Sequence, residues 1–170
     1  MNKIFIVMVA LCLTTLTLKA QDDLLSKHSP ELKAIFKSET AVFRGFKFGD
    51  TRATIKAGEG SVIEGEGKDF IVYKTKIDEN EYAEIMYTFD DQDKVKMFGV
   101  AFIENVNLSA EERILDDFQA YFTQKYGKFT INNKNDEVWT SAEGGYVVEM
   151  GDSSDGKSDL LEIEIEIFKK

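Results

Sequence analysis

Residues 161–167 read LEIEIEI, an uninterrupted alternation of apolar and acidic side chains. Successive side chains of a β-strand point to opposite faces of its sheet, so the apolar residues share one face and the glutamates share the other. A strand in a parallel sheet is buried on both faces and does not show this contrast. The stretch therefore predicts a half-buried strand in an antiparallel sheet with one acidic face.

Other segments of the chain show related strand patterns. We expect strands over residues 41–48, 70–77, 82–89, 95–103, 138–140 and 146–150. The apolar phase of 95–103 slips between Met97 and Phe98, beside Gly99, which predicts a β-bulge there. The connections between consecutive strands are short, and short connections favour antiparallel pairing.

A long helix is predicted from Ser109 to Gly127. The sequence Ser109-Ala-Glu-Glu112 matches a capping box, and Gly127 suits the left-handed position that ends a helix. Apolar residues recur at helical spacing between these ends and predict one broad apolar face. They are Ile114, Leu115, Phe118, Phe122 and Tyr126.

Two shorter helices are expected earlier in the chain. Ser29-Pro30 is typical of an N-cap followed by proline at the first helical position, and predicts a helix through Phe36. Asp50 is a good N-cap for a second helix that ends near Gly58. The glycine-rich stretch that follows, residues 57–68, carries three glutamates and is expected to form a mobile loop, not a phosphate-binding loop.

These elements predict an α+β fold: a curved antiparallel sheet with helices packed on one face. Each half then consists of a helix followed by three strands, which suggests a pseudo-duplicated unit. We expect a signal peptide over residues 1–20, a lead-in segment with a short helix over 21–40, and a single domain over 41–170.

The N-terminus predicts export. Met1-Asn2-Lys3 supplies a positive charge, residues 4–18 form an uncharged apolar run, and Ala20 is a suitable residue before the cleavage site. The run of fifteen residues is shorter than the roughly 20 that a membrane-spanning helix needs. Leu11 precedes Cys12, whereas a lipoprotein needs a small residue there. We expect cleavage after Ala20 and a periplasmic or secreted protein without an integral membrane anchor.

The composition excludes several kinds of partner. Loss of Lys3 and Lys19 with the signal peptide leaves 19 basic and 31 acidic residues, a net charge of −12. Such a chain repels nucleic acids and anionic lipids. Cys12 is the one cysteine and leaves with the signal peptide, so disulfides and cysteine sites are not expected.

No catalytic or metal-binding constellation is predicted. His28 is the single histidine, and its neighbours in sequence supply no partner for catalysis or zinc binding. The segment 151–159 lacks a carboxylate at the first position of a calcium loop and is expected to be a hairpin loop. The turn at Asp90, Asp91 and Asp93 is expected to use its carboxylates for local hydrogen bonds. We expect no cofactor.

The sheet face opposite the long helix is the candidate binding surface. The glutamates at 162, 164 and 166 are expected to form a uniform solvated row on a sheet face. Tyr73, Tyr82, Met86 and Trp139 would form a docking surface if they lay together on the face away from the long helix. The alternative is that the lead-in helix covers this face. The sequence alone favours neither.

Two local patterns resemble a known group of exported bacterial domains. Residues 46–55, FKFGDTRATI, resemble the strand-to-helix entry of that group, and residues 122–128, FTQKYGK, followed by Trp139, resemble its helix ending. The group comprises β-lactamase-inhibitory-protein-like and outer-membrane-assembly-lipoprotein domains. The resemblance implies a non-enzymatic binding or scaffold module. The lipidated cysteine of the assembly lipoproteins is missing, so a role in membrane assembly is not expected, and no functional residue is carried over.

The sequence therefore predicts an exported, non-enzymatic domain that binds a protein or another cell-envelope component through a sheet face or edge. The main alternative is a carrier of a small apolar ligand, with a pocket on the curved sheet. A third alternative is a glycan hydrolase, which needs two carboxyl groups about 5–9.5 Å apart in one cleft. No ligand-binding residue is assigned from the sequence.

Overall fold

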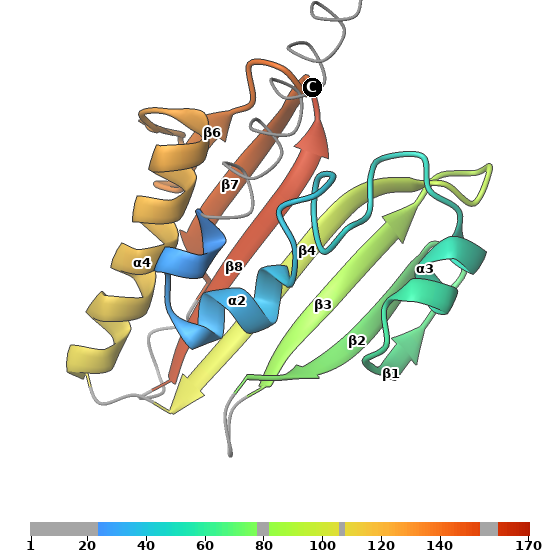
Figure 1. Cartoon of the computed structure of the whole chain (residues 1–170), viewed down its shortest axis with the longest axis horizontal. Helices are drawn as coiled ribbons and strands as arrows, with labels where there is room; N and C mark the ends of the chain where they lie inside the picture. Colours follow the sequence, from blue (N-terminus) through green and yellow to red (C-terminus); the bar gives the residue numbers. More distant parts are fainter. Residues whose placement is uncertain (1–23, 78–81, 106–107, 154–159) are drawn as a thin grey trace, which may run out of the picture.

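The computed structural model describes residues 24–77, 82–105, 108–153 and 160–170. Within these ranges the chain forms one open antiparallel sheet of eight strands, in the order β1-β2-β3-β4-β8-β7-β6-β5, together with three α-helices and a 3₁₀ turn (Figure 1). The signal peptide predicted over residues 1–20 and most of the loop expected over 151–159 lie outside the described residues.

The elements have the following bounds in chain order: η1 Leu25–Lys27, α2 Pro30–Phe36, α3 Arg52–Gly58, β1 Val62–Glu66, β2 Phe70–Lys76, β3 Tyr82–Phe89, β4 Val95–Asn105, α4 Leu108–Tyr126, β5 Thr130–Ile131, β6 Glu137–Thr140, β7 Tyr146–Asp152 and β8 Leu160–Lys169. The α+β class and the antiparallel sheet are confirmed. Helix α3 precedes β1–β4, α4 precedes β5–β8, and β4 pairs with β8 in the middle of the sheet.

The alternation in β8 produces the expected division between two faces. Ile163, Ile165 and Ile167 are each 1% exposed, and they pair in register with Phe102, Val100 and Phe98 of the neighbouring β4. Burial of a side chain of this size contributes roughly 1.5–3 kcal/mol relative to leaving it in water. The glutamates between them lie on the opposite face.

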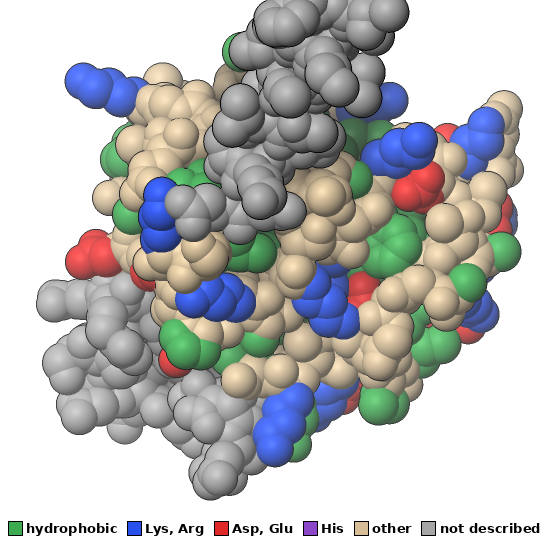
Figure 2. All heavy atoms as spheres, viewed as in Figure 1, with side chains coloured by type: hydrophobic (Ala, Val, Ile, Leu, Met, Phe, Trp, Pro, Cys, Tyr) green, Lys and Arg blue, Asp and Glu red, His purple; other side chains and the backbone are tan. Residues whose placement is uncertain are grey.

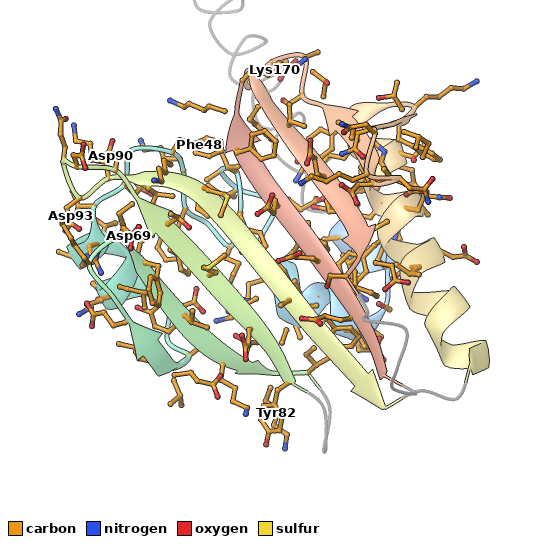
Figure 3. All side chains as sticks on the ribbon, turned by 180° about the vertical axis from the view of Figure 1, so that it is seen from behind. Phe48, Asp69, Tyr82, Asp90, Asp93 and Lys170 are labelled. Carbon is orange, nitrogen blue, oxygen red and sulfur yellow. The ribbon has the colours of Figure 1, made fainter. Side chains whose placement is uncertain are left out.

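The helices pack against the aromatic side of this sheet. Ser29 caps α2 by accepting a hydrogen bond from the backbone N–H of Leu32, as predicted, and Phe36 at the end of α2 contacts Phe118 and Phe122 of α4. Figure 1 shows α2 and α4 in front of the sheet, and the view from behind in Figure 3 shows the sheet strands uncovered. The lead-in helix therefore lies on the same side as α4.

Helix α4 ends as predicted, where Gly127 adopts a φ of 89° and its N–H donates to the carbonyl of Thr123. It begins at Leu108, one residue before the predicted start. The capping contacts expected of Ser109 and Glu112 lie outside the described side chains. In the described ranges no helix combines the length and the apolar character needed to cross a membrane.

The strand expected over residues 41–48 is wrong. Ala41, Arg44 and Gly45 all have positive φ values, which no strand allows, and the segment makes a tight reversal held by a single bridge between Phe43 and Phe46. Both phenylalanine side chains are buried. These two residues are therefore apolar because they are buried in the core, and their spacing does not indicate a strand.

The mobile loop expected over residues 57–68 is also wrong in part. Residues 62–66 form the edge strand β1, which pairs with β2 and shifts register between Ile63 and Gly65. A further short strand, β5, pairs with β6. Each half therefore has four strands after its helix instead of the three expected from the sequence.

Two local boundaries differ slightly from expectation. The bulge in β4 lies at Lys96, because Phe89 pairs with Val95 and Thr88 with Met97, so it falls just before the predicted position. Helix α3 is capped by Thr51, and the Asp50 carboxylate accepts a hydrogen bond from the N–H of Lys47 instead.

A buried ion pair joins the segments on the helix side. The side chains of Arg44 and Glu59 are fully buried, and Arg44 Nε donates to Glu59 Oε2 at 3.0 Å. Arg44 also donates to the carbonyls of Ala34 and Ile35 in α2, and the Tyr87 hydroxyl of β3 donates to Glu59. Burial alone would raise the pKa of Glu59, but hydrogen bonds and the positive charge of Arg44 lower it below its ordinary value.

We predict that Arg44→Met lowers the free energy of unfolding by about 3–5 kcal/mol, because the buried charge of Glu59 then loses its buried partner and keeps only the partly exposed ammonium of Lys37, 3.1 Å away. Urea unfolding followed by circular dichroism measures this change. Lys56→Met is the matched control, since Lys56 pairs with Glu66 at the exposed surface. Equal effects of the two substitutions would contradict a special role for the buried pair.

The same pair predicts a pH dependence. A glutamate whose pKa is lowered in the folded state stabilises the protein above its unfolded pKa of about 4.3, and this contribution is lost as the pH falls through the lower folded value. The difference in unfolding free energy between the wild type and Glu59→Gln should therefore be full at neutral pH and shrink in acid. Urea unfolding in a pH series tests this, and a difference that grows on acidification contradicts it.

Candidate functional site

The candidate site is the sheet face that carries no helix. Tyr82 and Met86 of β3 lie on this face, and Tyr82 is exposed at the end of its strand (Figure 3). Tyr73 and Trp139 do not: both are buried on the helix side, where Trp139 contacts Phe122 of α4. The docking surface predicted from these four residues is therefore wrong for Tyr73 and Trp139, and only Tyr82 and Met86 lie on the open face.

The two faces of the sheet differ in charge. On the helix side, Figure 2 shows more lysine and arginine side chains than carboxylates. The open face instead carries carboxylates from β3 and from the adjacent strands β8 and β7, which lie on either side of β4. They are Glu84, Glu149, Glu162, Glu164 and Glu166.

A narrow depression, here called the acidic slot, crosses the middle of the open face. Its volume is about 240 Å³, and Glu84, Glu164 and Glu166 are among its lining residues. Gly99 creates the space, because a Cβ at that position would lie 3.1 Å from the methyl group of its cross-strand neighbour Met86. Val72 and Ala101 complete the apolar floor. The slot thus combines an apolar floor with an acidic rim.

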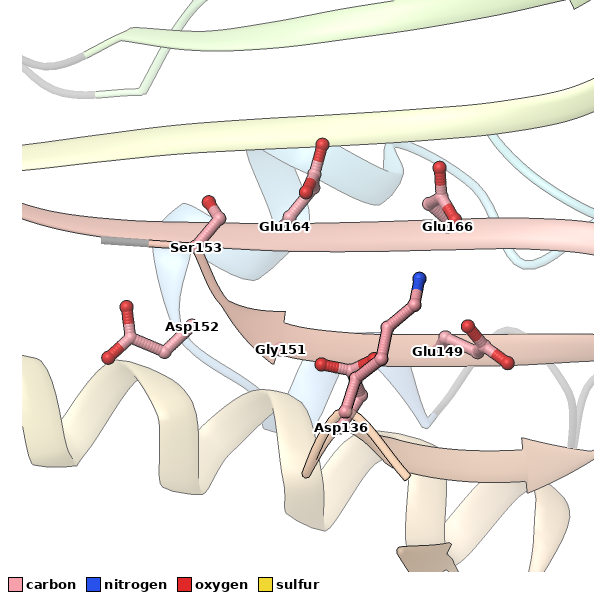
Figure 4. Close-up of a pocket in the computed structure, with 8 residues that line it drawn as sticks. Asp136, Glu149, Gly151, Asp152, Ser153, Glu164 and Glu166 are labelled. Carbon is pink, nitrogen blue, oxygen red and sulfur yellow. The ribbon is translucent and has the colours of Figure 1, made fainter. Parts of the chain in front are cut away.

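A second depression of about 260 Å³ adjoins the slot over β7 and β8 (Figure 4). Glu149 stands directly opposite Glu166 across the two strands. Asp136 and Lys134 reach this depression from the turn between β5 and β6. Like charges directly opposite each other destabilise a sheet, so this arrangement works against folding.

The carboxylates in this row are not equivalent. Burial raises the pKa of Glu166, and the negative charges of Glu164 and Glu149 raise it further, whereas Lys134 opposes the shift. Glu164 is exposed, while Glu166 is half-buried. The expectation of a uniform solvated row is therefore wrong, because strand pairing places Glu149 directly opposite Glu166, whereas Glu164 stands opposite Gly151.

The acidic turn after β3 behaves as expected from the sequence. Asp90 accepts hydrogen bonds from the N–H groups of Gln92 and Lys94, and these bonds hold its pKa below the ordinary value. Asp93 pairs with Arg52 at 2.7 Å. Within the described residues, no three histidine, cysteine or carboxylate side chains form a group that could hold a metal ion.

His28 has a partner that the sequence reasoning missed. It is only 8% exposed, and its Nδ1 lies 2.7 Å from the carboxylate of Asp117 in α4. Asp117 also accepts the N–H of Ser29, so the pair fastens the start of α2 to α4. The ring edge of His28 faces Tyr121, and its Nε2 has no hydrogen-bond partner. Since no nucleophile is described beside Nε2, we assign the pair a structural role.

Comparisons with protein-family models, with curated proteins and with solved structures give no match to this chain. The candidate site therefore depends on the geometry and charge of the chain itself.

We predict that Glu166→Gln stabilises the protein at pH 7 by about 0.2–1 kcal/mol, because it removes the like-charge contact with Glu149. The pKa of Glu166 is higher in the folded than in the unfolded state, so ionisation of its carboxyl destabilises the fold. This destabilisation is absent below the unfolded pKa, where the carboxyl is protonated in both states, and it grows as the pH rises. The gain should therefore vanish near pH 4. Glu84→Gln is the control in the same urea titrations, since Glu84 stands opposite Lys74. A loss of stability in Glu166→Gln would contradict the prediction.

Proposed function

We propose that the chain is an exported, non-enzymatic binding domain whose open sheet face binds a protein partner through basic side chains. The observation that carries the proposal is the acidic slot, with its apolar floor and carboxylate rim. Export follows from the signal peptide predicted over residues 1–20 and the periplasmic or secreted location that it implies.

The shape and chemistry of the slot suit a lysine or arginine side chain. Such a side chain buries its aliphatic stem against apolar surface and keeps its charged end at a polar rim. Met86, Gly99 and Ala101 would contact the stem, while Glu164 and Glu166 would bind the charged end. A protein supplies this group together with further contacts along the sheet, whereas the acidic surface disfavours nucleic acids and anionic lipids.

The electrostatic cost of the face supports a binding role. Glu84, Glu149 and Glu164 form no ion pair within the described part of the chain. Glu149 and Glu166 oppose each other across the strands. A bound cationic side chain would reduce this repulsion. The electrostatic repulsion that destabilises the free domain would therefore favour binding of a basic partner.

We also infer a pseudo-duplication that places this surface at the junction of two similar units. The mirrored strand order and the pattern of one helix followed by four strands support it. The resemblance to β-lactamase-inhibitory-protein-like domains implies the same class of activity, a scaffold that binds protein. The acidic slot lies where β4 of the first unit meets β8 of the second.

The alternatives have less support. The apolar-ligand carrier needs an enclosed apolar cavity, but among the described residues the helix side of the sheet is filled by aromatic side chains such as Tyr87, Phe98 and Phe36. A glycan hydrolase gains some support from the raised pKa of Glu166 beside Glu149. The depression that contains them, however, has no aromatic lining residue on which a sugar ring could stack.

A defined peptide tests the proposal. The probe is a short fluorescent peptide of alternating lysine and glycine, compared with a matched peptide that has glutamine for lysine. We predict that the lysine peptide binds, that binding weakens with salt, and that the Glu164→Gln/Glu166→Gln variant binds roughly fivefold more weakly. Gly99→Ala, which adds a Cβ to the slot floor, should also weaken binding.

The control variant is Asp91→Asn, which removes an exposed charge at the turn after β3. Equal losses of peptide affinity in the slot variants and in Asp91→Asn would show a general effect of net charge and would contradict a site at the slot. Cleavage of a polysaccharide by the purified protein, abolished in Glu166→Gln, would replace the proposal with the hydrolase.

A further inference from the structure

A separate cavity lies on the helix side, at the C-terminal end of α4. It is about 410 Å³ in volume, is open to solvent on one side, and is lined by residues of the segment 39–42, the end of α4 and the turn between β6 and β7. This volume falls within the usual range of small-molecule sites. The cavity, here called the α4-end pocket, shares no lining residue with the acidic slot.

An unsatisfied carboxylate lines this pocket. Glu39 is only 6% exposed, and its Oε2 is buried without a hydrogen-bond partner. A buried acceptor without a donor costs about 1–3 kcal/mol, and more for a charged group. A ligand that supplies an N–H or O–H donor would remove this cost.

A lysine ammonium lines the same pocket but does not satisfy that oxygen. Lys125 Nζ donates to the hydroxyl of Tyr121 at 2.9 Å and lies over the rings of Tyr121 and Tyr126, 5.2 and 5.5 Å from their centres. Burial lowers the pKa of Lys125, and the charge of Glu39 opposes that shift. The pocket thus holds one basic group, Lys125, and two acidic groups, the buried Glu39 and the exposed Glu143. Lys125 and Glu39 are not joined directly in an ion pair, but both contact the hydroxyl of Tyr121.

Tyrosine side chains shape the wall between these charges. The hydroxyls of Tyr126 and Tyr146 lie 3.2 Å apart, and their rings meet edge to face with centres 5.9 Å apart. Tyrosine hydroxyls both donate and accept hydrogen bonds. They therefore suit a small polar ligand.

We propose that the α4-end pocket binds a small zwitterion that carries a primary ammonium group and a carboxylate, as a free amino acid does. The ammonium donates to Glu39 Oε2, and the carboxylate accepts from Lys125 Nζ. A neutral polyol would satisfy the donor requirement of Glu39 but would leave the Lys125 charge unmatched. This function is independent of the protein-binding function proposed for the open sheet face.

Titration of the purified ¹⁵N-labelled protein with glycine, followed by NMR, tests the proposal. Glycine should produce saturable shifts of residues around the pocket. Methylamine and acetate each carry one half of the recognised group and should bind more weakly. Trimethylglycine lacks N–H donors and should bind at least about tenfold more weakly than glycine. Saturable binding of glucose without binding of glycine would overturn the proposal.

Variants separate a ligand site from a structural role. Glu39→Gln and Lys125→Gln should each weaken glycine binding at least about tenfold, while Lys128→Gln, an exposed lysine just beyond the same helix, should bind as the wild type does. Without ligand, Glu39→Gln should melt at the same or a higher temperature than the wild type, because it removes a buried carboxylate oxygen, Oε2, that has no hydrogen-bond donor. A lower melting temperature for Glu39→Gln, or unchanged glycine affinity in both pocket variants, would overturn the proposal.

Discussion

The structure depends on the buried ion pair between Arg44 and Glu59. Arg44 donates to carbonyls near the end of α2, Glu59 follows α3, and Tyr87 belongs to β3, so one polar cluster joins these segments beside the aromatic contacts Phe36–Phe43 and Phe46–Tyr87. Replacing such a pair with apolar residues often leaves stability unchanged, but removing one partner is expensive. The pair therefore specifies how the lead-in segment docks more than it adds to stability.

The alternation within the strands gives the two faces different roles. Aromatic and branched side chains on one face form the core with α2 and α4, so that face is committed to folding. The other face carries its glutamates at exposed and half-buried positions outside the aromatic core, where they can serve recognition. The α4-end pocket lies on the helix side instead, where loops leave Glu39 and Lys125 beside an unfilled space. The two proposed sites thus have separate structural origins.

The sequence predicted correctly those helices and strands that are determined by neighbouring residues, such as an alternating apolar pattern or a helix cap. The alternation of β8, the cap and proline of α2, and Gly127 at the end of α4 all appear as expected. The segments 41–48 and 62–66 were mispredicted because burial in the core and pairing at a sheet edge depend on distant residues. The row at 162, 164 and 166 was visible in the sequence, but its contact with Glu149 comes from strand register. The pairing of His28 with Asp117, 89 positions apart, had no sequence signal.

The mirrored strand order has a consequence for biosynthesis. The central strand β4 pairs with β8, which is synthesised only after α4 and three further strands. Until then the nascent first half presents β4, with Phe98 and Phe102, as an unprotected edge next to an apolar surface. Exposed edges of this kind promote intermolecular pairing. The growing chain is therefore most prone to intermolecular pairing in the interval between the synthesis of these two strands.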